Sequence, residues 1–192
     1  MLTCKTMLQN ISKGQSGIPL RYLLAGLEGD YNELKHTIRL MYVKKEQEKV
    51  MMYYKAPSST FQTLLYDVVF EFHGHDLIKI DTNTQFKVYC NSPSFYFRFA
   101  NTFKSYGSLL YIEKYPALVN DEAKVRNPVN VSGFDKYVYS CLRLSMIDTV
   151  DNLIQKMYRN TAPEVDSFNK KRFEYVKMQK LKKISEDNID LL

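Results

Sequence analysis

Carboxylates and histidines that could bind a metal or move protons lie in one short stretch, from Asp67 to His75. Metal-dependent nucleases carry an Asp followed some way on by Glu-x-Lys. Asp67 and Glu71 begin such a pattern, but the residue two after Glu71 is His73. His73 and His75 are metal-ligand types, yet no third ligand follows at a diagnostic spacing. We therefore expect solvated carboxylates on a strand and solvated histidines in a turn. A nuclease, the third-ranked hypothesis, would require Asp67, Glu71 and His73 to converge.

No other catalytic signature stands out. The seven glycines form no phosphate-cradling pattern, and no Ser or Cys has the flanking residues of a nucleophile elbow. We expect the protein not to be an enzyme and to need no metal and no other cofactor.

The second candidate site is a basic stretch near the C-terminus. Seven bases stand against one acid, Glu174, within fourteen residues: Lys170, Lys171, Arg172, Lys177, Lys180, Lys182 and Lys183. The same stretch predicts a helix with an apolar arc made of Phe173, Val176, Leu181 and Ile184. We favour a docking helix that uses this arc. In the alternative, Lys170, Lys171, Arg172 and Lys177 contact the phosphates of a nucleic acid.

Composition narrows the class of protein. The chain has 192 residues, within the usual range of one domain. Its net charge of +6 is spread along the chain, whereas a dedicated nucleic-acid binder concentrates its charge. Fifteen Tyr and eleven Phe with no Trp indicate either a large contact surface or a tyrosine-rich core.

Cysteine usage and hydropathy predict a reducing, cytoplasmic setting. Cys4, Cys90 and Cys141 are odd in number and widely separated, as expected of reduced thiols. Residues 1–10 lack the apolar run of a signal peptide. No stretch approaches the roughly eighteen apolar residues that a membrane span needs, so we expect no contact with a membrane.

Strands are predicted mainly in the first half of the chain. Residues 37–43 and 50–54 are rich in β-branched and aromatic residues and predict a hairpin around the charged stretch 44–49. A continuous helix over residues 31–55 is the rival interpretation. Residues 63–72 alternate between apolar and polar positions and give the clearest strand. Two short strands are expected at residues 77–80 and 85–89.

Helices are predicted mainly in the second half. Ser92 before Pro93 caps a helix whose Phe95, Phe99 and Phe103 share one face. Residues 115–132 are predicted to form a long loop. Ser132 with Asp135 resembles a capping box that opens the next helix, and a second helix begins afresh near Asp148. An earlier short helix is expected over residues 20–27, with Gly29 just beyond its end.

These elements predict one α+β domain, residues 17–160, in which a mostly antiparallel sheet from residues 37–90 is packed by later helices. A flexible N-terminal arm is expected over residues 1–16. A basic amphipathic helix and an acidic tail are expected over residues 164–192.

Two stretches carry a resemblance to a known group of proteins. The first runs from Phe86 to Phe95 and leads into the aromatic helix. The second covers residues 124–139. The region from residue 86 to 145 resembles small virion-associated proteins of tailed bacteriophages, although it contains no catalytic signature. The resemblance implies copies that assemble in rings or in neck and tail structures, located in the host-cell cytoplasm or the virion.

The function expected from the sequence is therefore structural. We expect a non-enzymatic assembly protein that works by forming homo-oligomers or by contacting other copies in a viral assembly. The alternative is a basic accessory protein that binds nucleic acid through its C-terminal helix.

Overall fold

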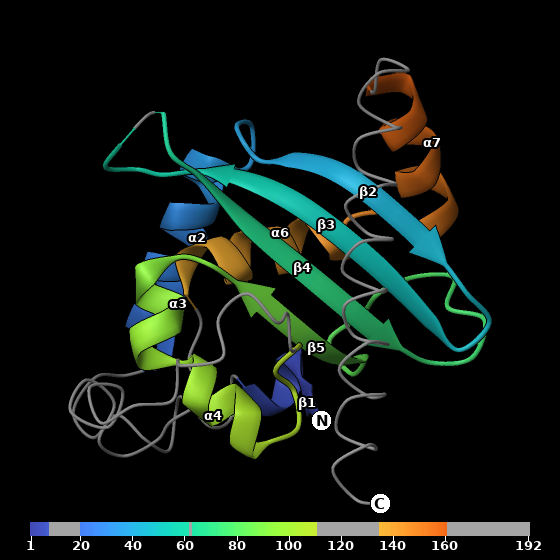
Figure 1. Cartoon of the computed structure of the whole chain (residues 1–192), viewed down its shortest axis with the longest axis horizontal. Coiled ribbons are helices and arrows are strands. Elements are labelled where there is room, and N and C mark those ends of the chain that lie inside the picture. The colour runs from blue at the N-terminus through green and yellow to red at the C-terminus, as the bar shows by residue number, and fades with distance from the viewer. Residues whose placement is uncertain (8–19, 62, 111–134, 161–192) are drawn as a thin grey trace, which may run out of the picture.

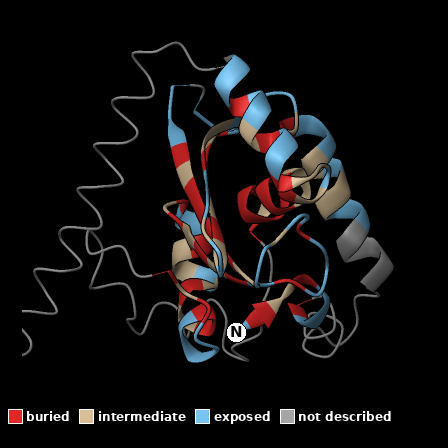
Figure 2. Cartoon of the chain, turned by 90° about the vertical axis from the view of Figure 1, so that its right-hand side faces the viewer, coloured by how far each residue is buried: buried red, intermediate tan, exposed pale blue. Residues whose placement is uncertain are grey.

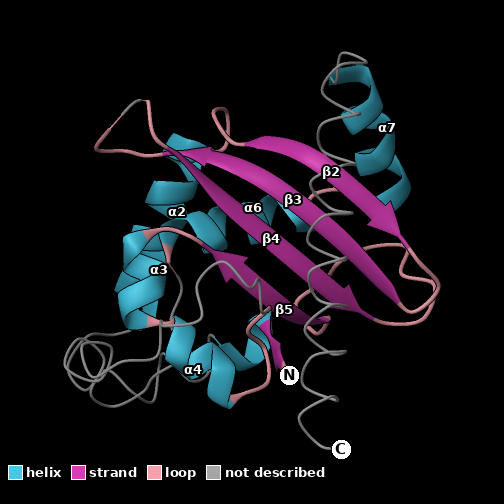
Figure 3. Cartoon of the chain, in the orientation of Figure 1, coloured by secondary structure: helices cyan, strands magenta, loops and turns pink. Residues whose placement is uncertain are grey.

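The computed structural model describes residues 1–7, 20–61, 63–110 and 135–160 (Figure 1). In this part of the chain, five strands form one antiparallel sheet in the spatial order β1-β5-β4-β3-β2 (Figure 3). Their bounds are Leu2–Thr3 for β1, Arg39–Lys45 for β2, Lys49–Pro57 for β3, Leu65–His73 for β4 and Gln85–Cys90 for β5. The larger helices are α2 (Leu20–Leu34), α6 (Lys136–Met146) and α7 (Val150–Asn160), and two short ones are α3 (Pro93–Arg98) and α4 (Ala100–Ser105). The predicted α+β class is confirmed.

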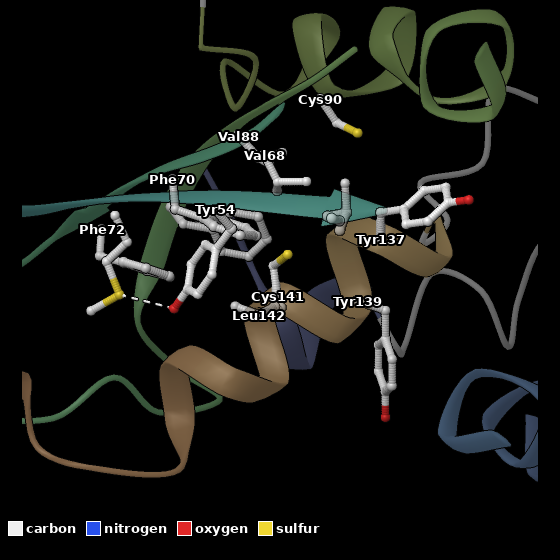
Figure 4. Close-up of a cluster of buried hydrophobic side chains, with 14 of the residues drawn as sticks. Tyr54, Val68, Phe70, Phe72, Val88, Cys90, Tyr137, Tyr139, Cys141 and Leu142 are labelled. Carbon is white, nitrogen blue, oxygen red and sulfur yellow. Dashed lines mark hydrogen bonds between the residues drawn. The ribbon is translucent and has the colours of Figure 1, made fainter. Parts of the chain in front are cut away.

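Strand β4 positions the core, because its alternate residues all point to the helices. This apolar face consists of Tyr66, Val68, Phe70 and Phe72. Figure 4 shows Tyr54 of β3 and Phe70 of β4 pointing toward Cys141 and Leu142 of α6. The buried hydroxyl of Tyr54 lies 2.7 Å from that of Ser145, so its polar atom is satisfied inside the core.

The predicted hairpin is confirmed, and the rival helix over residues 31–55 is wrong. Strands β2 and β3 pair in antiparallel register and leave residues 46–48 as the turn. The expected short strand over residues 77–80 is not formed. Its only ladder contact with other described residues is an isolated bridge between Lys79 and Thr149, because this segment meets the turn between α6 and α7. Ile80 is nevertheless buried.

Helix α2 is longer than predicted and passes through Gly29 to Leu34. A helical interior tolerates glycine at a cost of about 1 kcal/mol. The extension places Tyr31 and Leu34 against the core, in addition to Leu27 of the predicted part. The predicted break near Asp148 is confirmed, since α6 ends at Met146 and α7 begins at Val150.

The aromatic helix predicted after Ser92 forms as two short pieces, α3 and α4, that meet at Phe99. Phe95 and Phe103, the outer two of the predicted face, are fully buried and their ring centroids lie 5.4 Å apart. Phe99 is only partly buried.

Ser92 and Asp135 join the first turns of α3 and α6. Ser92 accepts a hydrogen bond from the amide of Phe95, as its predicted capping role requires. Its hydroxyl also donates to Asp135 at 3.0 Å. Asp135 is the N-cap of α6 and accepts from the amides of Tyr137 and Val138. Burial raises the pKa of Asp135, and these hydrogen bonds oppose that rise. Ser132, the other half of the predicted box, lies outside the described residues.

The flexible arm expected over residues 1–16 is wrong for its first seven residues. Leu2 and Thr3 pair with β5, and the amide of Leu2 donates to the hydroxyl of Ser108. Leu2, Cys4 and Met7 are buried. The backbone of Leu2 and Thr3 covers part of an edge of β5 that would otherwise expose unpaired backbone groups. Residues 8–16, the predicted loop over 115–132 and the predicted segment 164–192 lie outside the described residues.

The opposite edge of the sheet, β2, is covered by α7. The amide of Val43 donates to the sulfur of Met157 at 3.2 Å, and Lys45 pairs with Asp151 at 3.3 Å. Among the described helices, none is both long enough and apolar enough to cross a membrane.

Truncating Phe70 tests the core. Its ring stacks on Phe72 with centroids 5.2 Å apart and contacts Phe86 edge-on. We expect Phe70→Ala to lower the free energy of unfolding by about 3–5 kcal/mol. Tyr158→Ala, at an exposed position of α7, is the control and should change it by no more than about 0.5 kcal/mol. Urea unfolding measures both variants, and equal losses would contradict the assigned core.

Candidate interaction site

The face of the sheet opposite α6 carries a row of apolar and aromatic side chains that crosses the strands. Tyr42, Tyr53, Val69 and Tyr89 stand side by side in the strand register. Leu110 extends the row beyond β5, because residues 108–110 run alongside Val88. Tyr53, Val69 and Leu110 are buried together, and Met41, Tyr42, Met51 and Tyr89 pack around them. We call this set the apolar row.

Described helices contribute no side chain to the apolar row. Figure 1 shows α2 and α6 behind the sheet, and Figure 2, turned by 90°, shows the large helices to one side of the strands. The two faces of the sheet therefore differ in what covers them.

Charged groups flank the apolar row, and Glu71 is at the centre of the larger group. Glu71 lies directly across the strands from Lys87. Its carboxylate is 3.1 Å from the amine of Lys49 and 3.5 Å from that of Lys87, and its side chain is only 8% exposed. Burial acts to raise the pKa of Glu71, but the hydrogen bond and charge of Lys49, the charge of Lys87 and that of His73 hold the pKa below its ordinary value.

His73 belongs to the same group. Its Nε2 lies 3.0 Å from the carboxylate of Glu71, but the alignment does not make a hydrogen bond. Burial lowers the pKa of His73, and the charges of Lys87 and Lys49 lower it further. The Glu71 carboxylate opposes both effects without overcoming them. The structure therefore favours a neutral His73.

Asp67, on the other side of the apolar row, is occupied by different partners. It pairs with Lys55 across the strands and accepts a 2.6 Å hydrogen bond from the hydroxyl of Tyr53. The amine of Lys55 also lies over the Tyr53 ring, 5.7 Å from its centroid.

The structure brings Glu71 and His73 together but not Asp67. Four residues of extended strand separate the two carboxylates by about 13 Å, and each is held by its own lysines. Glu71 is also buried, so the expected solvated face is wrong for this residue. No cluster of three or more Cys, His, Asp or Glu side chains within the described ranges is placed to hold a metal ion. His75 lies in the predicted turn, exposed and 2.8 Å from Asp76.

The cysteines are unreactive in their surroundings. Cys4, Cys90 and Cys141 are all free and buried. Burial raises the pKa of the Cys4 thiol to about 11 and those of Cys90 and Cys141 well above their ordinary value. Near neutral pH all three stay protonated, and a protonated thiol is a poor nucleophile.

An exposed apolar surface lies at one end of β4. Phe61 is 63% exposed, and Leu64 and Leu65 are exposed beside it. The amide of Leu64 donates to the carbonyl of Phe61, which closes the turn that leads into β4. The turn is fixed to the start of α6, because the hydroxyl of Tyr137 accepts from the amide of Ser59 at 3.1 Å. We call Phe61, Leu64 and Leu65 the tip surface.

A second exposed apolar surface lies at the other end of β4. Ile78 follows β4 and is 68% exposed, and Ile147 follows α6 and is 55% exposed. The two segments are joined because the amide of Val150 donates to the carbonyl of Ile78 at 2.8 Å. We call Ile78 and Ile147 the base surface. The nine residues of β4 separate the tip from the base by about 30 Å.

The residues predicted from sequence for interaction lie outside the described residues. They are Phe173, Val176, Leu181 and Ile184 for docking, and Lys170, Lys171, Arg172 and Lys177 for phosphate contacts. Sequence reasoning did not identify the tip and base surfaces. A usable signal was present at Leu65, which the alternation of β4 places on the polar side of the strand.

Comparison with known proteins adds no assignment to this site. No family model, no curated protein and no solved structure matches the chain.

Acidification tests the electrostatics of Glu71 and His73. Because folding holds the pKa of His73 below its ordinary 6.5, the unfolded chain takes up that proton first as the pH falls. The free energy of unfolding should therefore drop as the pH is lowered from 6.5 toward the folded-state pKa. Glu71, whose pKa is held below 4.5, should add a second loss under more acidic conditions. Urea unfolding at a series of pH values measures both.

Two variants test whether His73 causes the loss of stability just below pH 6.5. His73→Gln should flatten the loss of stability just below pH 6.5, whereas His75→Gln, at an exposed position two residues on, is the matched control. An undiminished loss in His73→Gln would contradict the assignment to His73.

Proposed function

We propose that the protein is a non-enzymatic assembly protein that self-associates head to tail, the tip surface of one copy packing on the base surface of the next. The observation that carries this proposal is the pair of exposed apolar surfaces at opposite ends of β4. Contiguous exposed apolar groups mark protein contacts more often than isolated ones do. Because the two surfaces differ, a contact between them is heterologous and repeats from copy to copy.

The large number of aromatic residues does not carry the proposal. In the described part of the chain, half of the twelve largest fully buried side chains are aromatic: Tyr54, Phe70, Phe72, Phe86, Phe95 and Phe103. A tyrosine- and phenylalanine-rich core, one of the two explanations open from the sequence, therefore accounts for much of the excess.

Both edges of the sheet are covered, which favours contacts between copies through side chains over strand addition. Strand β2 is covered by α7 and carries exposed Lys44 and Lys45, and exposed lysines discourage edge-to-edge pairing. Strand β5 is covered by β1 along one half and by residues 108–110 along the other. Joining two copies by strand addition would require one of these covers to be displaced.

The resemblance of residues 86–145 to small virion-associated proteins of tailed bacteriophages fits the same proposal. Head-to-tail contacts close into rings when the rotation between copies allows it, and rings are among the assemblies that the resemblance implies. In this proposal the partner is a second copy of the chain, in the host-cell cytoplasm or in a virion.

Light scattering on two double variants tests the proposal. Phe61→Asp with Leu65→Asp removes the tip surface, and Ile78→Asp with Ile147→Asp removes the base surface. Each buried side chain of this size contributes about 1.5–3 kcal/mol, or about 10- to 100-fold in Kd. We expect the wild-type chain to be oligomeric and each variant alone to be monomeric.

An equimolar mixture of the two variants distinguishes head-to-tail contact from other modes. One intact tip then meets one intact base, so the mixture should form a dimer and nothing longer. Tyr158→Asp, at an exposed aromatic residue of α7, is the control that should leave assembly unchanged. A monomeric wild type, or a mixture that stays monomeric, would overturn the proposal.

A further inference from the structure

The apolar row is deeply buried, although no described helix contributes a side chain to it. Tyr53, Val69 and Leu110 are 4%, 6% and 7% exposed. Side chains on a sheet face stand roughly perpendicular to it, so their outer ends remain solvated unless another layer lies above them. Yet the row consists only of strand residues and Leu110. Burial of this kind is typical of a sheet face that a second layer covers.

We propose that the C-terminal segment, residues 164–184, docks as a helix on the apolar row of its own chain, with Phe173, Val176, Leu181 and Ile184 toward the sheet. The chain would then have three layers, with the sheet in the middle. This docking uses neither the tip nor the base surface and is independent of the proposed self-association.

The position of the end of α7 supports docking of residues 164–184 on the apolar row. Helix α7 runs along the edge of β2, with Asp151 at Lys45 and Met157 at the amide of Val43. Its last turns therefore approach the end of the apolar row at Met41 and Tyr42. Thr161-Ala162-Pro163 follows, and a proline there favours a change of direction. The chain thus leaves α7 beside the surface that needs covering.

The length of the segment also fits. Twenty-one helical residues span about 31 Å. Five neighbouring strand positions, from Tyr42 to Leu110, span about 19 Å at the usual strand spacing. The segment can therefore cover the whole row. A free helix of this length is marginal in water, so its apolar arc needs such a surface.

The other long stretch outside the described residues is a weaker occupant. Residues 111–134 leave the sheet at Leu110 and must return the chain to Asp135, which lies on the other side of the sheet beside Ser92. Residues 8–19 contain only three large apolar side chains, Leu8, Ile11 and Ile18.

Two adjacent methionines of β3 report whether each face of the sheet is covered. Met51 packs around the apolar row, whereas Met52 points to the opposite face and is fully buried in the core. Dilute hydrogen peroxide oxidises methionine sulfur according to its accessibility. Peptide mass spectrometry of the full-length protein can therefore follow the two faces of β3 separately.

The experiment compares the wild type with Phe173→Asp and Leu181→Asp. We expect Met51 to oxidise severalfold faster in each variant, while Met52 stays protected as in the wild type. Lys182→Asp introduces the same charge nine residues after Phe173, on the opposite side of the helix, and should leave Met51 protected. If Phe173→Asp also exposes Met52, the domain has unfolded, and the milder Phe173→Ala decides by the same contrast.

Dilution and added DNA distinguish docking within one chain from contact with a neighbouring copy or with a nucleic acid. Protection of Met51 that persists on dilution supports docking within one chain. Protection that disappears on dilution would overturn the proposal in favour of a neighbouring copy, and protection that appears only with added duplex DNA would overturn it in favour of a nucleic acid. An unchanged Met51 rate in both Asp variants would also overturn it. The tip and base double variants should keep Met51 protected. Failure of the docking proposal is therefore distinguishable from failure of the self-association proposal.

Discussion

Strand β4 is hydrogen-bonded to a neighbour along nearly its whole length on both sides, and the rest of the structure depends on its register. With a side-chain period of two, a slip of one residue would turn Asp67 and Glu71 into the helical core and Phe70 out of it. The register thus decides which face of β3 and β5 meets α6. It also aligns Tyr53, Val69 and Tyr89 into one row and places Lys87 opposite Glu71.

The environment of Glu71 was predicted only in part from local sequence. The alternation of β4 correctly assigns its residues to two faces. The same alternation predicts that Asp67 and Glu71 are solvated. Glu71 is buried because lysines from two other strands reach it, Lys49 from β3 and Lys87 from β5. Their approach depends on cross-strand register, which spacing along one strand does not contain. The same pairing lowers the pKa of a carboxylate that burial alone would raise.

The elements that were predicted correctly have local causes, and those that were not depend on distant partners. The hairpin, β4 and the cap at Ser92 follow from alternation, β-propensity and capping chemistry within a few residues. By contrast, residues 1–7 are ordered by the free edge of β5, more than eighty residues away. Residues 77–80 pair with Thr149 and not with the sheet for a similar reason. The tip and base surfaces could not be foreseen together, because only the fold places Ile147 near Ile78 and both far from Phe61.

Most of the surface chemistry in the described chain is already committed to internal partners, and this constrains how the molecule can contact another. The carboxylates of the sheet hold lysines, the two sheet edges are covered, and the thiols are buried. Two groups of exposed apolar side chains lie at the two ends of β4. A contact built from such groups has little directional chemistry, so its specificity must come from shape. One hydrogen bond fixes each end to a neighbouring element: the Ser59 amide donates to Tyr137 at the tip, and the Val150 amide donates to Ile78 at the base. In the proposed head-to-tail assembly, the two ends lie about 30 Å apart along one strand, so the register of β4 would set the position of each added copy.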